Sequence, residues 1–248
     1  MKINKNDTIS KTLIVAISLC LICSAIISSV AVSLRELQEE NQSKYQRSKI
    51  LASAGLLSNK ENFEELFSSI EEKIINLDTG EYETSLHPKT FNGKLFESQD
   101  YAKDISTSLI LSPQEDKASI KRREKFAKIY LYRSENKLSA IIFPIRGLGL
   151  WGTLYGYLAV KPDLQTIIGL EYYKHKETPG LGGEVDNPKW KSLWKGKRIF
   201  SPSEEIKITV IKGLVSPSSP EAIYQVDGLS GATITSKGIS NMLSFWLS

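Results

Sequence analysis

Cysteine and histidine are nearly absent from this 248-residue chain. The two cysteines, Cys20 and Cys23, lie in one apolar N-terminal stretch, so the rest of the sequence cannot form a disulfide framework. The chain has two histidines, whereas a zinc centre needs three or four ligands. His175 has one glutamate close by in sequence, Glu177, which is too few ligands for a metal. We therefore expect no metal site, and we expect His175 to be a surface or loop residue.

An excess of charge of one sign is also missing. The chain has 32 basic and 28 acidic residues, which gives a net charge of +4. Nucleic-acid binding would need a concentrated basic face, so nucleic acid is excluded as a partner. The basic run at 121–125 lies in a polar segment, 112–126, which is typical of a solvated loop or helix end rather than a phosphate-binding patch.

One run alone is apolar and long enough to cross a membrane. Residues 12–34 contain no charged side chain, and a helix rising about 1.5 Å per residue over this run spans the ~30 Å hydrocarbon core. A cleaved signal peptide would have a shorter apolar region of about 7–15 residues, and the residues before the two cysteines are too large for a lipoprotein signal. We predict an uncleaved, single-pass anchor.

The charges on either side of this run predict its orientation. Three lysines precede it, opposed by a single aspartate, whereas acidic residues follow Arg35. The positive-inside rule then places residues 1–11 in the cytoplasm and the C-terminal domain on the extracytoplasmic, periplasmic side.

The rest of the chain predicts an α+β fold. A helix at 37–57 is expected to leave the membrane directly, with polar residues giving way to apolar ones, and apolar spacings of three and four residues indicate a second helix at 59–75. Together these make residues 35–75 a helical connector. The remaining 76–248 form one domain, in which alternation and β-branched residues indicate strands at 128–132, 138–144, 153–160, 166–173, 206–212 and 223–226. A final helix is expected at 237–247, capped by Thr235 or Ser236. Strands and helices do not alternate regularly, which argues against a doubly wound parallel sheet.

Two glycine-rich segments could carry chemistry. In residues 144–156 four glycines would let the backbone come close to a flat group, covered by Trp151 or Tyr155. The alternative is a glycine-rich hairpin whose aromatic side chains fill the core. Residues 175–184 lack the glycine spacing of a dinucleotide-binding fold and the Gly-Lys-Ser/Thr of a P-loop, so neither nucleotide motif applies.

A third segment, residues 227–236, predicts a strand, a turn and the start of the last helix. Free N–H groups at a helix N-terminus favour a phosphate, and the small side chains of Gly231 and Ala232 leave the Thr233 hydroxyl accessible. The same pattern also fits a purely structural turn.

The sequence of this third segment, Asp-Gly-Leu-Ser-Gly-Ala-Thr at 227–233, resembles the flavinylation motif of the FMN-binding domain family. Most of the chain resembles the C subunit of the sodium-translocating NADH:quinone reductases. That family also shows a Leu-Gln…Asn…Ile-Leu…Ala-Gly-Leu helix, matched at 37–56, an Arg-Gly-x-Gly-Leu-Trp segment, matched at 146–151, and Glu-Thr-Pro-Gly-Leu-Gly, matched at 177–182. Four motifs in the family's order make the resemblance specific.

The resemblance implies that a flavin transferase attaches FMN covalently to Thr233 through a phosphoester. It implies further flavin-binding residues, which are Asp227, Ser230, Gly231, Ala232, Glu177, Thr178, Leu181, Gly182, Trp151 and Tyr155, and no catalytic acid or base. The chain would relay electrons among the other subunits of a membrane complex in the bacterial inner membrane. That complex, a translocase, oxidises NADH, reduces ubiquinone and transports sodium, and the chain alone would have no complete activity.

Three alternatives remain open from sequence. The chain is also similar to the G subunit of Rnf-type ferredoxin:NAD reductase complexes, around the membrane helix and the two threonine-containing motifs. It could act alone as an extracytoplasmic electron-transfer flavoprotein. It could also be a sensor or assembly domain that uses the same turn for protein contact.

Overall fold

The structure is a computed structural model that describes residues 9–57, 63–86, 90–91, 94–95 and 101–248. The chain divides into two compact units, one up to Tyr45 and the other from Gln46 to Ser248. Each unit is described by itself.

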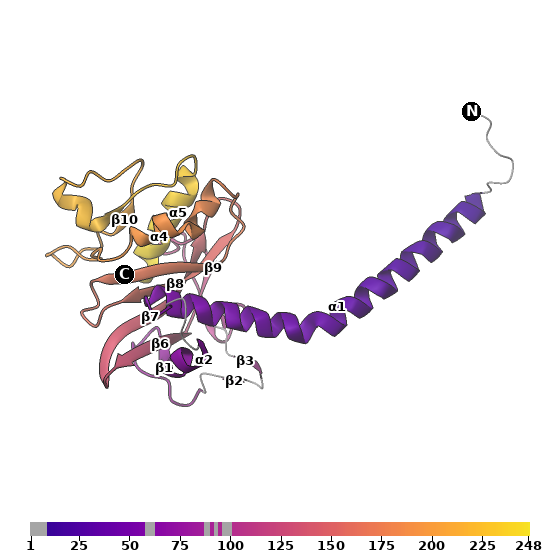
Figure 1. Cartoon of the computed structure of the whole chain (residues 1–248), viewed down its shortest axis with the longest axis horizontal. Helices are drawn as coiled ribbons and strands as arrows, with labels where there is room; N and C mark the ends of the chain where they lie inside the picture. The colour runs from indigo at the N-terminus through magenta and orange to yellow at the C-terminus, as the bar shows by residue number, and fades with distance from the viewer. Residues whose placement is uncertain (1–8, 58–62, 87–89, 92–93, 96–100) are drawn as a thin grey trace. The chain divides into compact units, whose positions relative to one another are not determined.

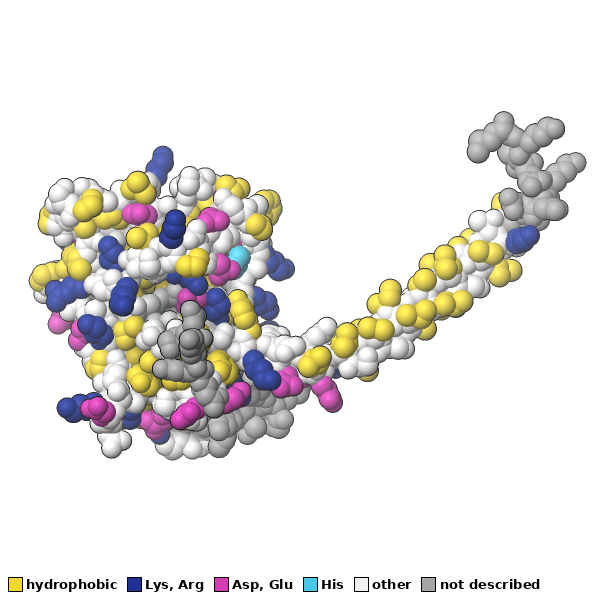
Figure 2. All heavy atoms as spheres, viewed as in Figure 1, with side chains coloured by type: hydrophobic (Ala, Val, Ile, Leu, Met, Phe, Trp, Pro, Cys, Tyr) yellow, Lys and Arg dark blue, Asp and Glu magenta, His cyan; other side chains and the backbone are white. Residues whose placement is uncertain are grey.

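The first unit is helical throughout its described part, which belongs to α1 (Ile9–Ser53). Figure 2 shows hydrophobic side chains along this helix, and its leucine, isoleucine and valine side chains from Ile9 to Val32 are exposed. Within the described residues, α1 is the one helix that is long and apolar enough to cross a membrane. The predicted membrane span at 12–34 lies inside it.

The second unit is built on a five-stranded antiparallel sheet with the strand order β1-β6-β7-β8-β9 (Figure 1). The strands are β1 (Ile70–Asn76), β6 (Phe126–Ser134), β7 (Lys137–Leu148), β8 (Thr153–Val160) and β9 (Ile167–Lys174). The predicted strands at 128–132, 138–144, 153–160 and 166–173 correspond to the last four, and the predicted α+β class is confirmed.

Each face of this sheet is covered by a different helix. The end of α1, with Ile50 and Leu51, packs on the face that carries Ile142, Tyr157 and Ala159. The C-terminal helix α5 (Thr233–Trp246) packs on the other face. Both faces of the central strands are therefore buried.

Shorter elements complete the second unit. Three are helical turns near the sheet: α2 (Phe63–Ser68), η1 (Gly182–Asp186) and α4 (Pro188–Ser192). The others are β2 (Thr90–Phe91), β3 (Lys94–Leu95), β4 (Ser108–Ile110), β5 (Arg122–Glu124), β10 (Thr209–Val210), η2 (Pro220–Tyr224) and β11 (Gln225–Val226).

The prediction of a helix at 59–75, and with it the all-helical connector, is wrong in its second half. Residues 59–62 lie outside the described residues, α2 is short, and Ile70–Asn76 form the edge strand β1. Ile70 and Ile74 are both buried, and a spacing of four places two side chains on the same side of a helix and of a strand. The spacing could not decide between them.

Two further expectations need correction. The predicted strands at 206–212 and 223–226 shrink to the two-residue parallel pair β10 and β11. The segment 112–126 is not simply a solvated loop, because β5 pairs with β4 and the buried carboxylate of Glu124 forms an ion pair with Arg146.

Candidate functional site

The carboxylate of Glu177, just after β9, joins the three segments singled out in the sequence. Its Oε1 accepts hydrogen bonds from the backbone N–H groups of Leu150 (3.0 Å) and Trp151 (2.9 Å) at the tip of the β7–β8 hairpin. Its Oε2 accepts the hydroxyl of Thr235 in the first turn of α5, at 2.5 Å. Residues that lie 26, 27 and 58 positions from Glu177 in the sequence therefore all bind its side chain.

The charge state of Glu177 follows from two opposing effects. Burial alone would raise the pKa of this carboxyl, but hydrogen bonds from Thr235 and from the backbone of Trp151, Leu150 and Gly152 outweigh it. The pKa is lowered below its ordinary value. Glu177 is therefore charged at neutral pH.

Glycines allow these segments to approach one another. A Cβ on Gly149 would lie 2.6 Å from Glu177 Oε1, and one on Gly182 would lie 2.6 Å from Oε2. A Cβ on Gly238 of α5 would lie 2.3 Å from the carbonyl oxygen of Leu148. A side chain at any of these positions would push the hairpin, the 177–182 loop or α5 apart.

Helix α5 begins without a side-chain cap. Thr233 is its first residue and is exposed, while Ala232 takes the cap position and makes no capping hydrogen bond. The prediction that Thr235 or Ser236 caps the helix is wrong. Thr235 bonds to Glu177, and the Ser236 hydroxyl accepts the N–H of Leu229 at 3.0 Å.

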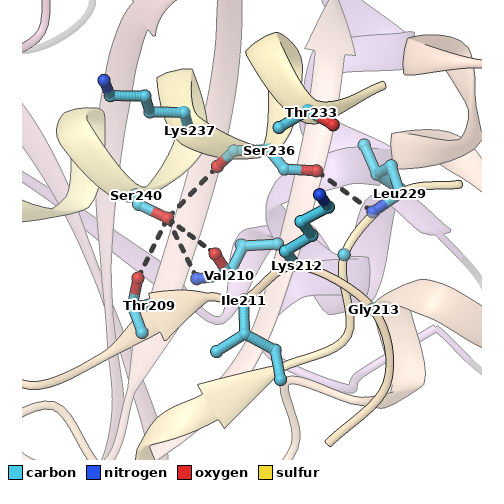
Figure 3. A pocket seen from close by; sticks show the side chains of 11 residues that line it. Thr209, Val210, Ile211, Lys212, Gly213, Leu229, Thr233, Ser236, Lys237 and Ser240 are labelled. Carbon is cyan, nitrogen blue, oxygen red and sulfur yellow. Dashed lines mark hydrogen bonds between the residues drawn. The ribbon is translucent and has the colours of Figure 1, made fainter. Parts of the chain in front are cut away.

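A pocket of about 200 Å³ opens beside Thr233 (Figure 3). It lies between the first turns of α5 and the strand and loop at 209–213. Its lining contains two lysines, Lys212 and Lys237, and no acidic residue.

Exposed apolar side chains come from the same segments. Two of the predicted site residues are among them, Trp151 (66% exposed) and Leu181 (44%). Sequence reasoning missed Leu150 (44%) and Ile234 (59%). A Cβ on Gly231 would lie 2.9 Å from Leu181 Cδ2, so the turn before Thr233 touches the 177–182 loop. Ile234 could have been found from its position directly after the expected acceptor.

The remaining predicted residues have varied surroundings. Thr178 and Ser230 are exposed, and Ala232 is buried. The Asp227 carboxylate accepts a hydrogen bond from the N–H of Val215 at 2.8 Å. The backbone carbonyl oxygen of Asp227 accepts one from Trp190 Nε1 at 2.8 Å. Asp227 therefore fixes the chain before the turn.

The structure does not bring Tyr155 and Thr233 together. Leu154 packs in the core below α5, and the next residue along β8, Tyr155, points to the opposite face of the sheet. The centroid of the Tyr155 ring lies 6.1 Å from that of Tyr173. Tyr173 packs with the α1 side of the sheet. The expectation that Tyr155 lies near a flavin on Thr233 is therefore not supported.

His175 lies in a loop, as one of the two expected alternatives has it, but it is only partly exposed. It lies just after β9, its side chain is 17% exposed, and Nε2 is 2.8 Å from Asp186 Oδ2. Within the described residues, no group of three or more potential ligands could hold a metal ion.

A protein of known family is similar to this chain over nearly the full length. The C subunit of the Na(+)-translocating NADH-quinone reductase of Pseudomonas aeruginosa is 44% identical over 245 residues, which cover 97% of this chain and 92% of that protein. This chain belongs to the family of these C subunits. The corresponding protein of Vibrio alginolyticus is 39% identical over 98% of this chain and 92% of that protein.

Further comparisons agree with this assignment. The family model described as "FMN-binding domain" matches residues 149–248, which include every predicted site residue. The crystal structure of NqrC from Shewanella oneidensis superposes with a TM-score of 0.74 at 35% identity, covering 85% of this chain and 93% of that one. The NqrC fold is therefore shared.

Proposed function

We propose that this chain is a membrane-anchored flavoprotein subunit that carries FMN covalently on Thr233, through a phosphoester, and relays electrons within a sodium-translocating NADH-quinone reductase complex. NADH oxidation, ubiquinone reduction and sodium transport are activities of the whole complex, a translocase. The chain alone completes none of them.

The exposure of Thr233 at the uncapped start of α5 carries the proposal. Its hydroxyl is accessible for attachment, and Ala232 and Gly231 beside it leave room for an approaching transferase. The helix dipole and its free N–H groups favour the negative charge of a phosphoester, and no acidic residue in the first turn opposes it.

The surroundings of Thr233 fit both parts of FMN. The exposed side chains of Trp151, Leu181, Leu150 and Ile234 offer an apolar surface to a flat ring. The bound flavin supplies one-electron redox chemistry. The two carboxylate oxygens of Glu177 are occupied by the hairpin and by Thr235, so we assign Glu177 to positioning these apolar side chains rather than to contact with the flavin.

The apolar part of α1 supports the anchor, and the lysines at positions 2, 5 and 11 support a cytoplasmic N-terminus. The second unit then lies on the periplasmic side of the bacterial inner membrane. A flavin transferase active in that compartment is the expected maturation partner.

The alternatives differ in their partners. The names of the relatives favour the quinone-reductase subunit over the Rnf G subunit. A protein that acts alone would purify from mild detergent without other subunits, whereas the proposed function requires co-purification with a multi-subunit redox complex.

The acceptor is tested with Thr233→Ala and the matched control Thr233→Ser, expressed as full-length chains together with the transferase. Thr233→Ala should lose flavin fluorescence on a denaturing gel because no hydroxyl remains at this position. Thr233→Ser keeps a hydroxyl and should retain some fluorescence. Undiminished fluorescence of Thr233→Ala would show that the acceptor lies elsewhere.

A further inference from the structure

The pocket beside Thr233 carries positive charge without a counter-charge. Lys212 and Lys237 line it, and the residues around them are apolar, small or hydroxylated. Neither lysine makes an ion pair with any residue that the structure describes. The unpaired charges add to the positive end of the α5 dipole.

Lys212 is held at this place by the motif that precedes Thr233. The N–H of Ile211 donates to the carbonyl of Val226 at 2.9 Å, and the N–H of Gly228 donates to the carbonyl of Gly213 at 2.8 Å. Lys212 lies between two residues that are tied to 226–228. In Figure 3 its ammonium group points toward the first turn of α5, whereas Lys237 extends from the rim.

Asp227 and Gly228 of the motif explain how this loop comes so close. The Asp227 carboxylate holds the N–H of Val215, just after the loop. A Cβ on Gly228 would lie 2.3 Å from the carbonyl oxygen of Ile211 and would push the loop away. The Asp-Gly pair therefore fixes the position of Lys212 relative to the acceptor threonine.

We propose that this pocket binds the phosphate of the Thr233-linked flavin, with Lys212 as its main charge partner and Lys237 as the second. The inference rests on the proposed function and adds to it the residues that neutralise the phosphodiester. A Lys ammonium acts on phosphate as a point charge with three donors, and such charge-assisted hydrogen bonds are stronger than neutral ones. Asp227 is a positioning residue in this arrangement.

The first test is the initial rate at which the transferase attaches flavin to the purified full-length chain. Lys212→Gln should slow attachment about tenfold, the loss expected for one charge-assisted hydrogen bond, and Lys212→Arg should restore most of the rate. Lys237→Gln should have a smaller effect. Lys137→Gln is the matched control, because Lys137 is exposed at the far end of β7, about 35 Å along the strand from Leu148, and should not change the rate.

The second test is ³¹P NMR of the flavinylated full-length chain in detergent, which reports on the phosphodiester itself. The resonance should move in Lys212→Gln and stay in place in Lys137→Gln. An unmoved resonance in Lys212→Gln would overturn the proposal even if attachment were slow, because the lysine would then serve only the encounter with the transferase. Equal effects of Lys212→Gln and Lys137→Gln would also overturn it.

The proposed function fails in a distinguishable way. If Thr233→Ala still acquires covalent flavin, or the wild-type chain acquires none, the acceptor assignment falls and the pocket loses its ligand. If Thr233 carries flavin and the lysine variants behave as wild type, only the phosphate pocket is wrong.

Discussion

Replacement of Glu177 by glutamine should destabilise the second unit while preserving its shape. The amide oxygen can still accept from the N–H groups of Leu150 and Trp151, and Thr235 can turn its hydroxyl to accept from the amide nitrogen. What is lost is the charge. Hydrogen bonds to charged groups contribute about 1.5–3 kcal/mol and neutral ones about 0.5–1.5, so three bonds weaken by about 3 kcal/mol in total.

The assay is urea unfolding of the full-length chain in detergent, followed by tryptophan fluorescence. In thermal unfolding of the same proteins, a loss of about 3 kcal/mol would lower the melting temperature by roughly 6–12 °C for a unit of this size. Glu205→Gln is the control, because Glu205 is exposed and should change the free energy of unfolding by less than about 0.5 kcal/mol.

The effect should also depend on pH. The pKa of Glu177 is lowered in the folded chain, so its stabilisation is fully present above the ordinary carboxyl pKa of 4.5 and is lost as the pH falls through the lower folded value. The difference between wild type and Glu177→Gln should therefore narrow below about pH 4. Equal stability of the two proteins at pH 7, or a difference that grows on acidification, would refute the role given to this carboxylate.

Four other changes test separate parts of the molecule. Gly238→Ala should cost about 1–3 kcal/mol in urea unfolding, because the new Cβ meets the Leu148 carbonyl oxygen, and the neighbouring Lys237→Ala should be nearly neutral. A Gly238→Ala chain as stable as the wild type would contradict the close packing of α5 on the hairpin. Trp151→Ala should leave the free energy of unfolding within about 0.5 kcal/mol, since the side chain is 66% exposed, but should shift the flavin absorption spectrum; an identical spectrum would remove Trp151 from the flavin surroundings. Expression without a flavin transferase should give colourless protein, so covalent flavin under those conditions would argue for self-attachment. A reporter fused after Ser248 should be active only outside the cytoplasm, because moving the N-terminal lysines across the membrane costs ~2.5–3.5 kcal/mol for each charge at the bilayer centre. The N-terminal residues should remain on the protein, and a mature N-terminus near Arg35 would refute the anchor.

Local sequence patterns were sufficient to predict the apolar part of helix α1 and the strands β6 to β9. The apolar run within α1 is longer than the apolar region of a signal peptide, and each of the four strands contains β-branched or aromatic residues. β1 was missed because Ile70 and Ile74 satisfy both periods, and pairing with β6 decides between them. Such pairing between distant segments is not visible in a local pattern.

The same distinction applies to the site. The position of Thr233 follows from a contiguous motif, but the role of Glu177 depends on partners that lie far away in sequence. The surroundings of Tyr155 could not be predicted from the sequence either. Strand β8 is apolar on both faces, so the alternation of its residues does not show which face α5 covers.

The most direct test of the central claim is mass spectrometry of the chain isolated from its native membrane. Trypsin should release residues 213–237 as one peptide, because the basic residues at its two ends are Lys212 and Lys237, and fragmentation separates Thr233 from Thr235 and Ser236. The account predicts that this peptide is heavier by FMN less one water, with the added mass on Thr233. An unmodified peptide, or FMN on another residue, would contradict it.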